Sequence, residues 1–234
     1  MRNSKLIELY SLMNETELKK LDKFLASPYF NESETICQIH DFVRVFHPDY
    51  NHEALKKENL WKELYPTEAF NDNRLRHFMS RLLNLVQRFL AVQHFESDQF
   101  ASGLHNLKSL RTHGAEKPYL KAYQKFREKL DTEGSEAFLQ DFLLDEELNQ
   151  FYSVSSLVSI HKIDSGLKQS AQNLDLFYLV NKLRYFCAVI NYKNILKLEH
   201  RNLLMEEIIG IAGHDEFKTV PAVRLYYLIL KMLL

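Results

Sequence analysis

Apolar residues along the first half of the chain recur at intervals of three and four, the spacing of one face of an α-helix. Asn14 and Asn31 each stand three residues before a Glu, an arrangement that caps a helix N-terminus. We predict one helix from Asn14 to Ser27-Pro28 and a second from Asn31 to His47-Pro48, because proline disfavours helical geometry in the preceding residue. Their apolar faces comprise Leu18, Leu21, Phe24 and Leu25, then Ile36, Ile39, Phe42, Val43 and Phe46.

A third helix is predicted roughly from Glu53 to Tyr65, before Pro66, and a longer one begins at Asp72. The longer helix has the most regular apolar stripe of the chain. That stripe consists of Leu75, Phe78, Met79, Leu82, Leu83, Val86, Phe89 and Leu90.

Beyond Ser97 the same spacing continues through Phe100 and Leu110 to His113-Gly114, a sequence typical of a helix C-terminus. Pro118 suits the first turn of the next helix, which reaches Leu130. We expect a linker from Asp131 to Ser135 and a helix from Phe138 to about Tyr152. Val and Ser alternate over Ser153–Ile160, which a strand would also accommodate; we predict helix there.

The last third contains one internal similarity. Residues 176–183 (LFYLVNKL) align with residues 225–232 (LYYLILKM) at an offset of 49, with four identities. Helix pairs of tetratricopeptide and HEAT-like arrays repeat at about this length. Leu203, Leu204, Ile208 and Ile209 would form the second helix of such a unit. We therefore predict an all-α protein: a compact N-terminal helical domain over residues 1–96, then stacked antiparallel helix pairs, a short TPR-like solenoid, over residues 97–234.

The composition agrees with a folded helical protein. Hydrophobic residues make up 46% and aromatic residues 12% of the 234 positions, which excludes intrinsic disorder. Only 6 Gly and 5 Pro are present, too few for hairpin-rich β folds. The formal net charge of −1 creates no overall attraction to nucleic acid or an anionic membrane.

Compartment and association follow from a few segments. Cys37 and Cys187 form no CxxC pair, and Glu8 interrupts the apolar run near the N-terminus, so neither a disulfide framework nor a secretory signal is encoded. No segment suits a membrane span, and we expect a cytoplasmic protein.

The run LYYLILKMLL, Leu225–Leu234, lacks a polar face. We expect it to pack on another copy of the chain or, if this chain is a fragment, on a further helix of a longer protein.

The chain contains no recognisable catalytic motif. P-loop, GxGxxG, GxSxG and HExxH patterns are missing, so we predict no catalytic, metal-binding or cofactor-binding residue. The acidic clusters Asp145–Glu147 and Glu206–Glu207 are interpreted as solvated helix faces. His200 and His214 stand at predicted helix ends, where histidine commonly contacts backbone carbonyls. Cys187 has apolar neighbours, which keep a thiol protonated.

One polar constellation stands out on the helix that begins at Asp72. Arg74, His77, Arg81, Asn84 and Arg88 follow one another at steps of three and four, so they form one mostly cationic stripe opposite the leucines. The stripe has two interpretations: a phosphate-binding surface, because Arg presents a planar fork of donors to an anion, or the solvent side of an amphipathic helix.

The segment LKKENLWKELYPTEAFNDNRLRHFMSRLLNLVQRFL, residues 55–90, resembles part of the winged-helix effector domains of response regulators. The resemblance implies a degenerate winged-helix-like part over residues 53–95, with Arg74, His77 and Arg81 facing DNA. Where those domains form a glycine-containing β-hairpin wing, this sequence continues through Gln87–Val92 without a glycine. The matching positions are Glu58, Leu60, Leu64, Pro66, Asn73, Leu75, Arg76, His77, Ser80, Arg81 and Leu82.

Over its full length the chain is similar to uncharacterised all-helical bacterial proteins with tetratricopeptide-like helix pairs. Four phrases carry this resemblance: FLASPYFN (24–31), LYP (64–66), LRHFMSRLL (75–83) and PAVRLYYLILKML (221–233). The resemblance implies a helical-repeat fold and supplies no catalytic residue.

These observations favour a non-catalytic protein-interaction module or scaffold with a protein or peptide partner, since stacked helix pairs expose extended binding surfaces. The alternative is a DNA-binding transcriptional regulator that uses Arg74, His77 and Arg81, with Arg88 as a further nucleic-acid contact. An enzyme with an unrecognised site is the third hypothesis.

Overall fold

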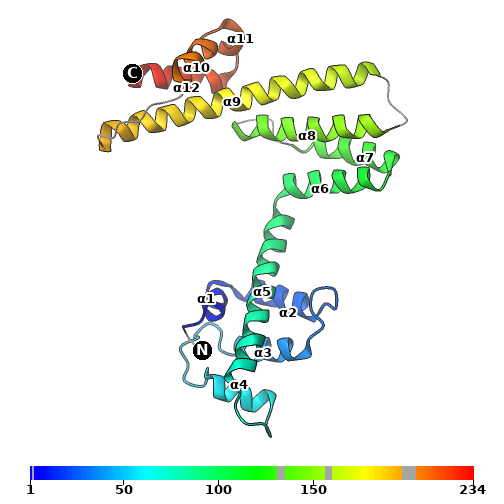
Figure 1. The fold of residues 1–234 in the computed structure, drawn as a ribbon, viewed down its shortest axis with the longest axis vertical. Helices are drawn as coiled ribbons and strands as arrows, with labels where there is room; N and C mark the ends of the chain where they lie inside the picture. Colours follow the sequence, from blue (N-terminus) through cyan, green and yellow to red (C-terminus); the bar gives the residue numbers. More distant parts are fainter. Residues whose placement is uncertain (2, 131–134, 156–159, 197–203) are drawn as a thin grey trace. The chain divides into compact units, whose positions relative to one another are not determined.

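The computed structural model describes residue 1 and residues 3–130, 135–155, 160–196 and 204–234. Within these ranges every regular element is an α-helix, twelve in all, and no strand occurs, which confirms the all-α prediction (Figure 1). The chain divides into two compact units, Met1–Asp98 and Gln99–Leu234, which we call unit 1 and unit 2.

Unit 1 is built around the long helix α5, whose apolar face is buried by the four helices before it. Its core contains Trp61, Tyr10 and Phe89 together with aliphatic side chains from all five helices. The bounds are α1 Lys5–Leu12, α2 Glu15–Ala26, α3 Glu34–Arg44, α4 Lys57–Leu64 and α5 Asp72–Ser97.

Helix α1 is not among the helices predicted from the sequence. Ser4 caps this helix by accepting a hydrogen bond from the Ile7 amide, and Leu6, Ile7 and Tyr10 are buried. Glu8, which interrupts the apolar run, is exposed, as one polar position per turn should be on an amphipathic helix. The interrupted apolar run near the N-terminus is therefore the pattern of a short amphipathic helix.

The two predicted Asn caps differ. Asn14 forms the expected capping box: its Oδ1 accepts from the Glu17 amide at 3.0 Å, and the Glu17 carboxylate accepts from the Asn14 amide at 2.8 Å. The prediction for Asn31 is wrong, because Ser33 occupies the N-cap position of α3. Asn31 is instead buried, and its amide nitrogen donates to the Leu25 carbonyl at 3.0 Å, which ties the loop after α2 to the end of that helix.

The third predicted helix begins four residues later than expected, at Lys57. The residues before it form turns in which side chains accept hydrogen bonds from the backbone. The Asp49 carboxylate accepts from the Asn51 amide at 3.0 Å, and His52 Nδ1 accepts from the Ala54 amide at 3.1 Å. Such local hydrogen bonds compete with helix formation.

The described residues of unit 2 form seven helices. Figure 1 shows that helices α6 to α9 reverse direction one after another. Helices α10 and α12 pack on the C-terminal part of α9, and the short helix α11 lies between them in the chain and contacts both. Gly114, with φ of 67°, follows α6 as predicted. The bounds are α6 Gln99–Thr112, α7 Glu116–Arg127, α8 Ser135–Val154, α9 Ile160–Leu196, α10 Met205–Ala212, α11 Asp215–Lys218 and α12 Pro221–Leu233.

Two separate apolar clusters hold unit 2 together. One joins α6, α7 and α8, where the Tyr119 and Phe151 rings stack with centroids 3.9 Å apart. The other joins α9, α10 and α12 and includes Leu183 and Leu230. The two segments of the internal similarity lie in α9 and α12, which pack against each other.

Three sequence expectations fall wholly or partly outside the described residues. They are the linker, of which Ser135 is described and begins α8, the segment Ser153–Ile160, and Leu203. Leu204 does not continue a helix: it has φ of 62° and precedes α10. No helix in the described ranges is both long and apolar enough to cross a membrane.

Candidate functional site

The predicted polar stripe lies on α5, and all five of its side chains are exposed. Its arginines differ in their surroundings. Arg74 pairs with Glu68 at 3.0 Å and lies over the Tyr65 ring, 4.2 Å from its centroid. Arg88 lies 5.0 Å from the centroid of Phe30. Part of the stripe's charge is therefore neutralised at the Arg74 end.

The interpretation of the Asp145–Glu147 cluster as a solvated helix face is wrong, whereas Glu206 and Glu207 are exposed as predicted. The Glu147 side chain is only 1% exposed, and Arg111 Nε and Nη2 donate to its two carboxylate oxygens at 2.7 and 3.1 Å. The Tyr119 hydroxyl donates to the Glu147 carbonyl at 3.2 Å. Glu147 thus joins α8 to α6 and α7, and the hydrogen bonds from Arg111 replace those that burial removes.

A row of polar side chains lies between α8 and α9. Asn173 Nδ2 donates to Asp145 at 2.8 Å, and Asn149 Nδ2 donates to Ser170 at 2.8 Å; all four residues are buried. Asn149 Oδ1 has no hydrogen-bond partner among the described residues. Burial raises the pKa of Asp145. A polar row of this kind fixes the register of two helices more than it stabilises them.

A groove of about 690 Å³ opens between α8 and α9 beside this polar row. Its lining is mostly apolar. A volume of this size falls in the range of ligand-binding clefts. The side chains that form its walls include Leu139 and Leu143 of α8, Phe177, Tyr178 and Tyr185 of α9, and Phe100 of α6.

Cationic side chains line the α9 wall of the groove. Lys182 Nζ lies 5.8 Å from the Tyr178 centroid and 5.4 Å from that of Phe186, and the Arg184 guanidinium lies 5.2 Å from the Tyr185 centroid. In the described part of the chain, neither cation forms an ion pair with a carboxylate. Glu136 is the one acidic residue that lines the groove, so the lining carries a net positive charge.

One end of the groove depends on a glycine. A Cβ atom at Gly103 of α6 would lie 2.3 Å from the Phe126 ring, so only glycine lets α7 approach this closely. Phe126 in turn contacts Phe100 at a centroid distance of 5.9 Å. This position could not be predicted from the sequence, because a lone glycine within a helical pattern gives no sign of what packs on it.

The remaining candidate residues do not converge on a reactive site. Glu206, Glu207 and His214 are exposed, and His200 lies outside the described residues. Burial raises the pKa of both Cys37 and Cys187, which disfavours their thiolates. Nowhere in the described ranges do three His, Cys, Asp or Glu side chains meet as metal ligands would.

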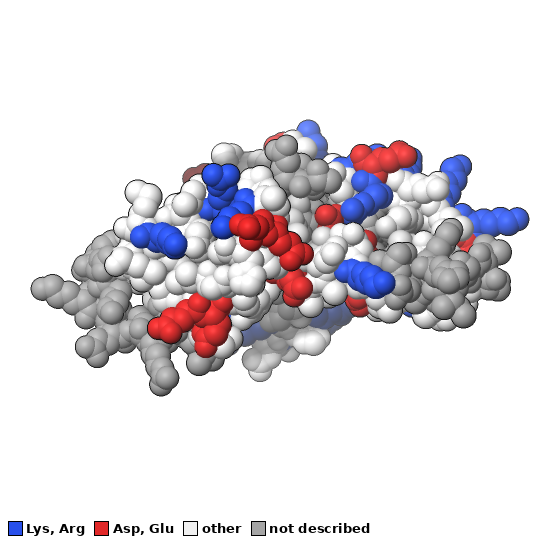
Figure 2. Space-filling view, turned by 90° about the horizontal axis from the view of Figure 1, so that it is seen from above, with Lys and Arg blue, Asp and Glu red and all other residues white. Residues whose placement is uncertain are grey.

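The surface charges are mixed. On the face shown in Figure 2, blue and red side chains are interspersed among uncharged residues.

No family model, curated protein or solved structure matches the chain.

Proposed function

We propose that the protein is a non-catalytic interaction module that binds a protein segment in the groove between α8 and α9. The observation that supports this most directly is the pairing of an apolar floor with exposed tyrosines along one wall. Aromatic residues are enriched where proteins bind each other, because they combine large apolar area with a polar tip.

The chemistry of the groove indicates the type of segment. Apolar side chains at helical spacing would occupy the floor, as in other helix-in-groove complexes. Lys182 and Arg184 would each gain a carboxylate partner that they lack within the described residues. We therefore propose an amphipathic segment with one apolar face and acidic residues beside it.

The arrangement of α6 to α9 agrees with the proposed helix-pair architecture. Consecutive helices run antiparallel (Figure 1). Helix α6 packs on α7 and on α8, the Tyr119 ring of α7 stacks on Phe151 of α8, and α8 packs on α9. The helices are unequal, since α9 has 37 residues and α7 has 12. We propose a TPR-like solenoid in which the long helix α9 serves both the α6–α8 group and the α10–α12 group.

The test uses peptides selected from a displayed random library on the full-length protein. Tyr185→Ala removes a groove tyrosine that is 59% exposed. Its matched control is Tyr192→Ala, on the same helix, 60% exposed and not part of the groove lining. Lys182→Glu has the control Arg224→Glu, an exposed cation on α12.

We expect the selected peptides to carry acidic and apolar residues and to lose about tenfold or more in affinity with Tyr185→Ala or Lys182→Glu, as at interface hot spots. The two controls should bind like the wild type. Equal losses in a groove variant and its control, or selected peptides that are neutral or basic, would contradict the proposal.

We also propose self-association through α12. Leu225, Leu228 and Met232 recur at helical spacing and are exposed, while Val223 and Leu230 of the same helix are buried. A second copy would cover this apolar stripe. Leu228→Lys should then lower the molar mass measured by sedimentation equilibrium, whereas a mass of one chain for the wild type would contradict self-association.

The alternative, duplex DNA binding by α5, has one supporting observation. Arg81 and Arg88 are exposed and form no ion pair with a carboxylate in the described ranges. Against a winged-helix mode of binding, α5 continues as a helix through Gln87–Val92, where winged-helix domains place their wing. Salt-sensitive binding to random duplex that is lost in the Arg74→Ala/Arg81→Ala variant would support the alternative. Equal binding by the double variant would reject it.

A further inference from the structure

A second cavity, of about 340 Å³, lies in unit 1 between α5 and the loop that follows α2. We call it the loop cavity. Tyr29, Phe30 and Glu32 line it from the loop, and Arg81 and Asn84 line it from α5. Phe30 also packs against the core of unit 1, whereas Tyr29, Glu32 and Asn84 belong neither to that core nor to the proposed protein interaction.

Tyr29 is 81% exposed. Its ring meets Phe30 edge to face, with centroids 5.0 Å apart, and Phe30 stacks on the buried Phe24 at 4.0 Å. The amides of Phe30 and Asn31 both donate to the Ser27 carbonyl at 3.0 Å. These contacts fix the backbone of the loop, and the Tyr29 ring is therefore exposed to solvent without any ligand bound.

Two arginines flank this aromatic surface. Arg81 lines the cavity, and Arg88 lies over Phe30, with no carboxylate ion pair to either in the described part of unit 1. Seven residues separate them, so their Cα atoms are about 10.5 Å apart along the axis of α5. One phosphate does not readily bridge that separation, whereas the backbone of a nucleic-acid strand carries a charge at each nucleotide.

We propose that the loop cavity binds single-stranded nucleic acid. An unstacked base lies on the Tyr29 ring, the Asn84 amide hydrogen-bonds the edge of that base, and Arg81 and Arg88 contact the flanking phosphates. Stacking on aromatic side chains beside a cationic track is how proteins hold single strands without reading their sequence. Glu32 repels phosphate, which directs the base, and not the backbone, toward the loop.

A single strand fits these residues better than a duplex does. In a duplex the bases are stacked on each other, so their faces are closed to Tyr29. A free nucleotide shares the same chemistry but would contact only one of the two arginines. The test therefore compares an oligonucleotide, a mononucleotide and a duplex.

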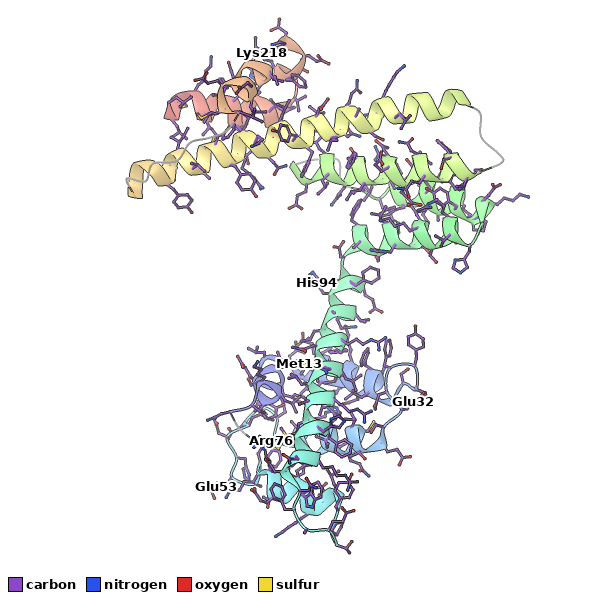
Figure 3. The ribbon with its side chains drawn as sticks, viewed as in Figure 1. Met13, Glu32, Glu53, Arg76, His94 and Lys218 are labelled. Carbon is purple, nitrogen blue, oxygen red and sulfur yellow. The ribbon has the colours of Figure 1, made fainter. Side chains whose placement is uncertain are left out.

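The experiment measures fluorescence anisotropy of a labelled twelve-nucleotide oligo-dT with the full-length protein over a series of salt concentrations. Tyr29→Ala removes the stacking surface, and Tyr192→Ala is its control in unit 2. Arg81→Ala/Arg88→Ala removes the phosphate contacts, and Arg76→Ala is its control on α5. Arg76 lies five residues before Arg81, so the two point about 140° apart around the helix; Figure 3 labels Arg76 and Glu32 on different sides of α5.

We expect Tyr29→Ala to weaken binding by about 5- to 150-fold, the range for loss of one stacked base. The double arginine variant should reduce the slope of log affinity against log salt by about 1.4, for two contacts at 0.7 each. Both controls should bind like the wild type, and AMP and an unlabelled duplex should compete poorly. All the changed side chains are exposed, and circular dichroism verifies that the variants fold.

Three results would overturn the proposal. The first is no measurable binding of the oligonucleotide at low salt. The second is an equal effect of Tyr29→Ala and Tyr192→Ala. The third is tighter binding of the duplex or of AMP than of the single strand; tighter duplex binding would instead support α5 as a DNA-binding helix.

Discussion

Tyr10 and His40 form a hydrogen-bonded pair inside the core of unit 1. Tyr10 Oη lies 2.6 Å from His40 Nδ1, and His40 Nε2 lies 2.7 Å from Asp22 Oδ1. Burial raises the pKa of Tyr10 well above its usual value, so its hydroxyl remains a donor. With Nε2–H directed at the Asp22 carboxylate, Nδ1 is left to accept from Tyr10. Each polar group thus has a partner, as buried polar groups require.

Tyr10→Phe removes only the hydroxyl of this pair. We expect the free energy of unfolding to fall by about 1–3 kcal/mol, because His40 Nδ1 is left buried without a donor. Urea denaturation followed by tryptophan fluorescence measures the change. The control Tyr29→Phe alters an exposed hydroxyl and should stay within about 0.5 kcal/mol of the wild type. A Tyr10→Phe variant as stable as the control would show that the pair does not stabilise the fold.

Asp145 provides a test that depends on pH. Its pKa is raised in the folded state because burial disfavours the carboxylate. The folded state therefore binds a proton more tightly than the unfolded state does. The stability that this group contributes is present below its unfolded pKa and is lost as the pH rises through its folded pKa. Asp145→Asn keeps a side-chain oxygen that accepts the hydrogen bond from Asn173, but it has no carboxyl to ionise, so the variant does not lose this stability as the pH rises.

We therefore expect Asp145→Asn to be more stable than the wild type at pH 7, with the difference shrinking as the pH falls toward 4. Urea denaturation followed by circular dichroism at a series of pH values measures it. Asp215→Asn is a suitable control, because Lys218 lowers the pKa of that exposed carboxyl. A stability difference for Asp145→Asn that does not vary with pH would contradict the proposed burial of charge.

The same residues show what a sequence pattern can predict about single side chains. The Asn14 capping box was predictable because all its partners lie within three residues. Asn31 has the same local pattern, yet its amide bonds to Leu25, which the fold brings near. Glu147 was mistaken for a solvated residue because its partner, Arg111, lies 36 positions away. Local chemistry is readable from spacing, whereas a long-range partner is not.

At the scale of elements, the approach of α8 to α9 depends on Gly166. A Cβ atom there would lie 2.3 Å from Asn149 Oδ1, and the bond from Asn149 Nδ2 to Ser170 limits how far that side chain can rotate away. We expect Gly166→Ala to cost about 1–3 kcal/mol, as overpacking does. In an Asn149→Ala background the clash is gone, and the same change should be neutral or stabilising, since alanine favours helix over glycine by about 1 kcal/mol.

The control for this double-mutant cycle is Gly210→Ala in α10, where nothing lies within 4 Å of an added Cβ. It should stabilise the protein by up to about 1 kcal/mol. Thermal denaturation followed by circular dichroism measures all four variants. If Gly166→Ala changes the stability of the otherwise wild-type protein as Gly210→Ala does, then α8 and α9 do not pack as closely at Gly166 as described.

The long amphipathic helix α5 could be predicted from sequence because its apolar residues keep one period from Leu75 to Leu90. The groove between α8 and α9 could not. Its walls come from three helices, and each of its aromatic residues looks like an ordinary core position in its own helix. A groove forms where helices pack against each other, so the sequence of any one of these helices does not predict it.

At the scale of the molecule, the core of unit 1 is self-contained. Its buried apolar residues all fall between Leu6 and Phe89. The chain has one tryptophan, Trp61, which is buried in that core and donates through Nε1 to the Glu68 carbonyl at 3.2 Å. Tryptophan fluorescence therefore reports on unit 1 alone, even within the full chain.

We expect residues 1–98 to fold as a separate polypeptide, with an unfolding enthalpy of about 60–80 kcal/mol at the midpoint, the value for a domain of that size. The fluorescence midpoint in urea should be the same in the fragment and in the full chain, because the described residues of the core around Trp61 all belong to unit 1. A fragment that unfolds at clearly lower urea would mean that unit 2 stabilises unit 1. A fragment without a cooperative transition would mean that this core is insufficient by itself.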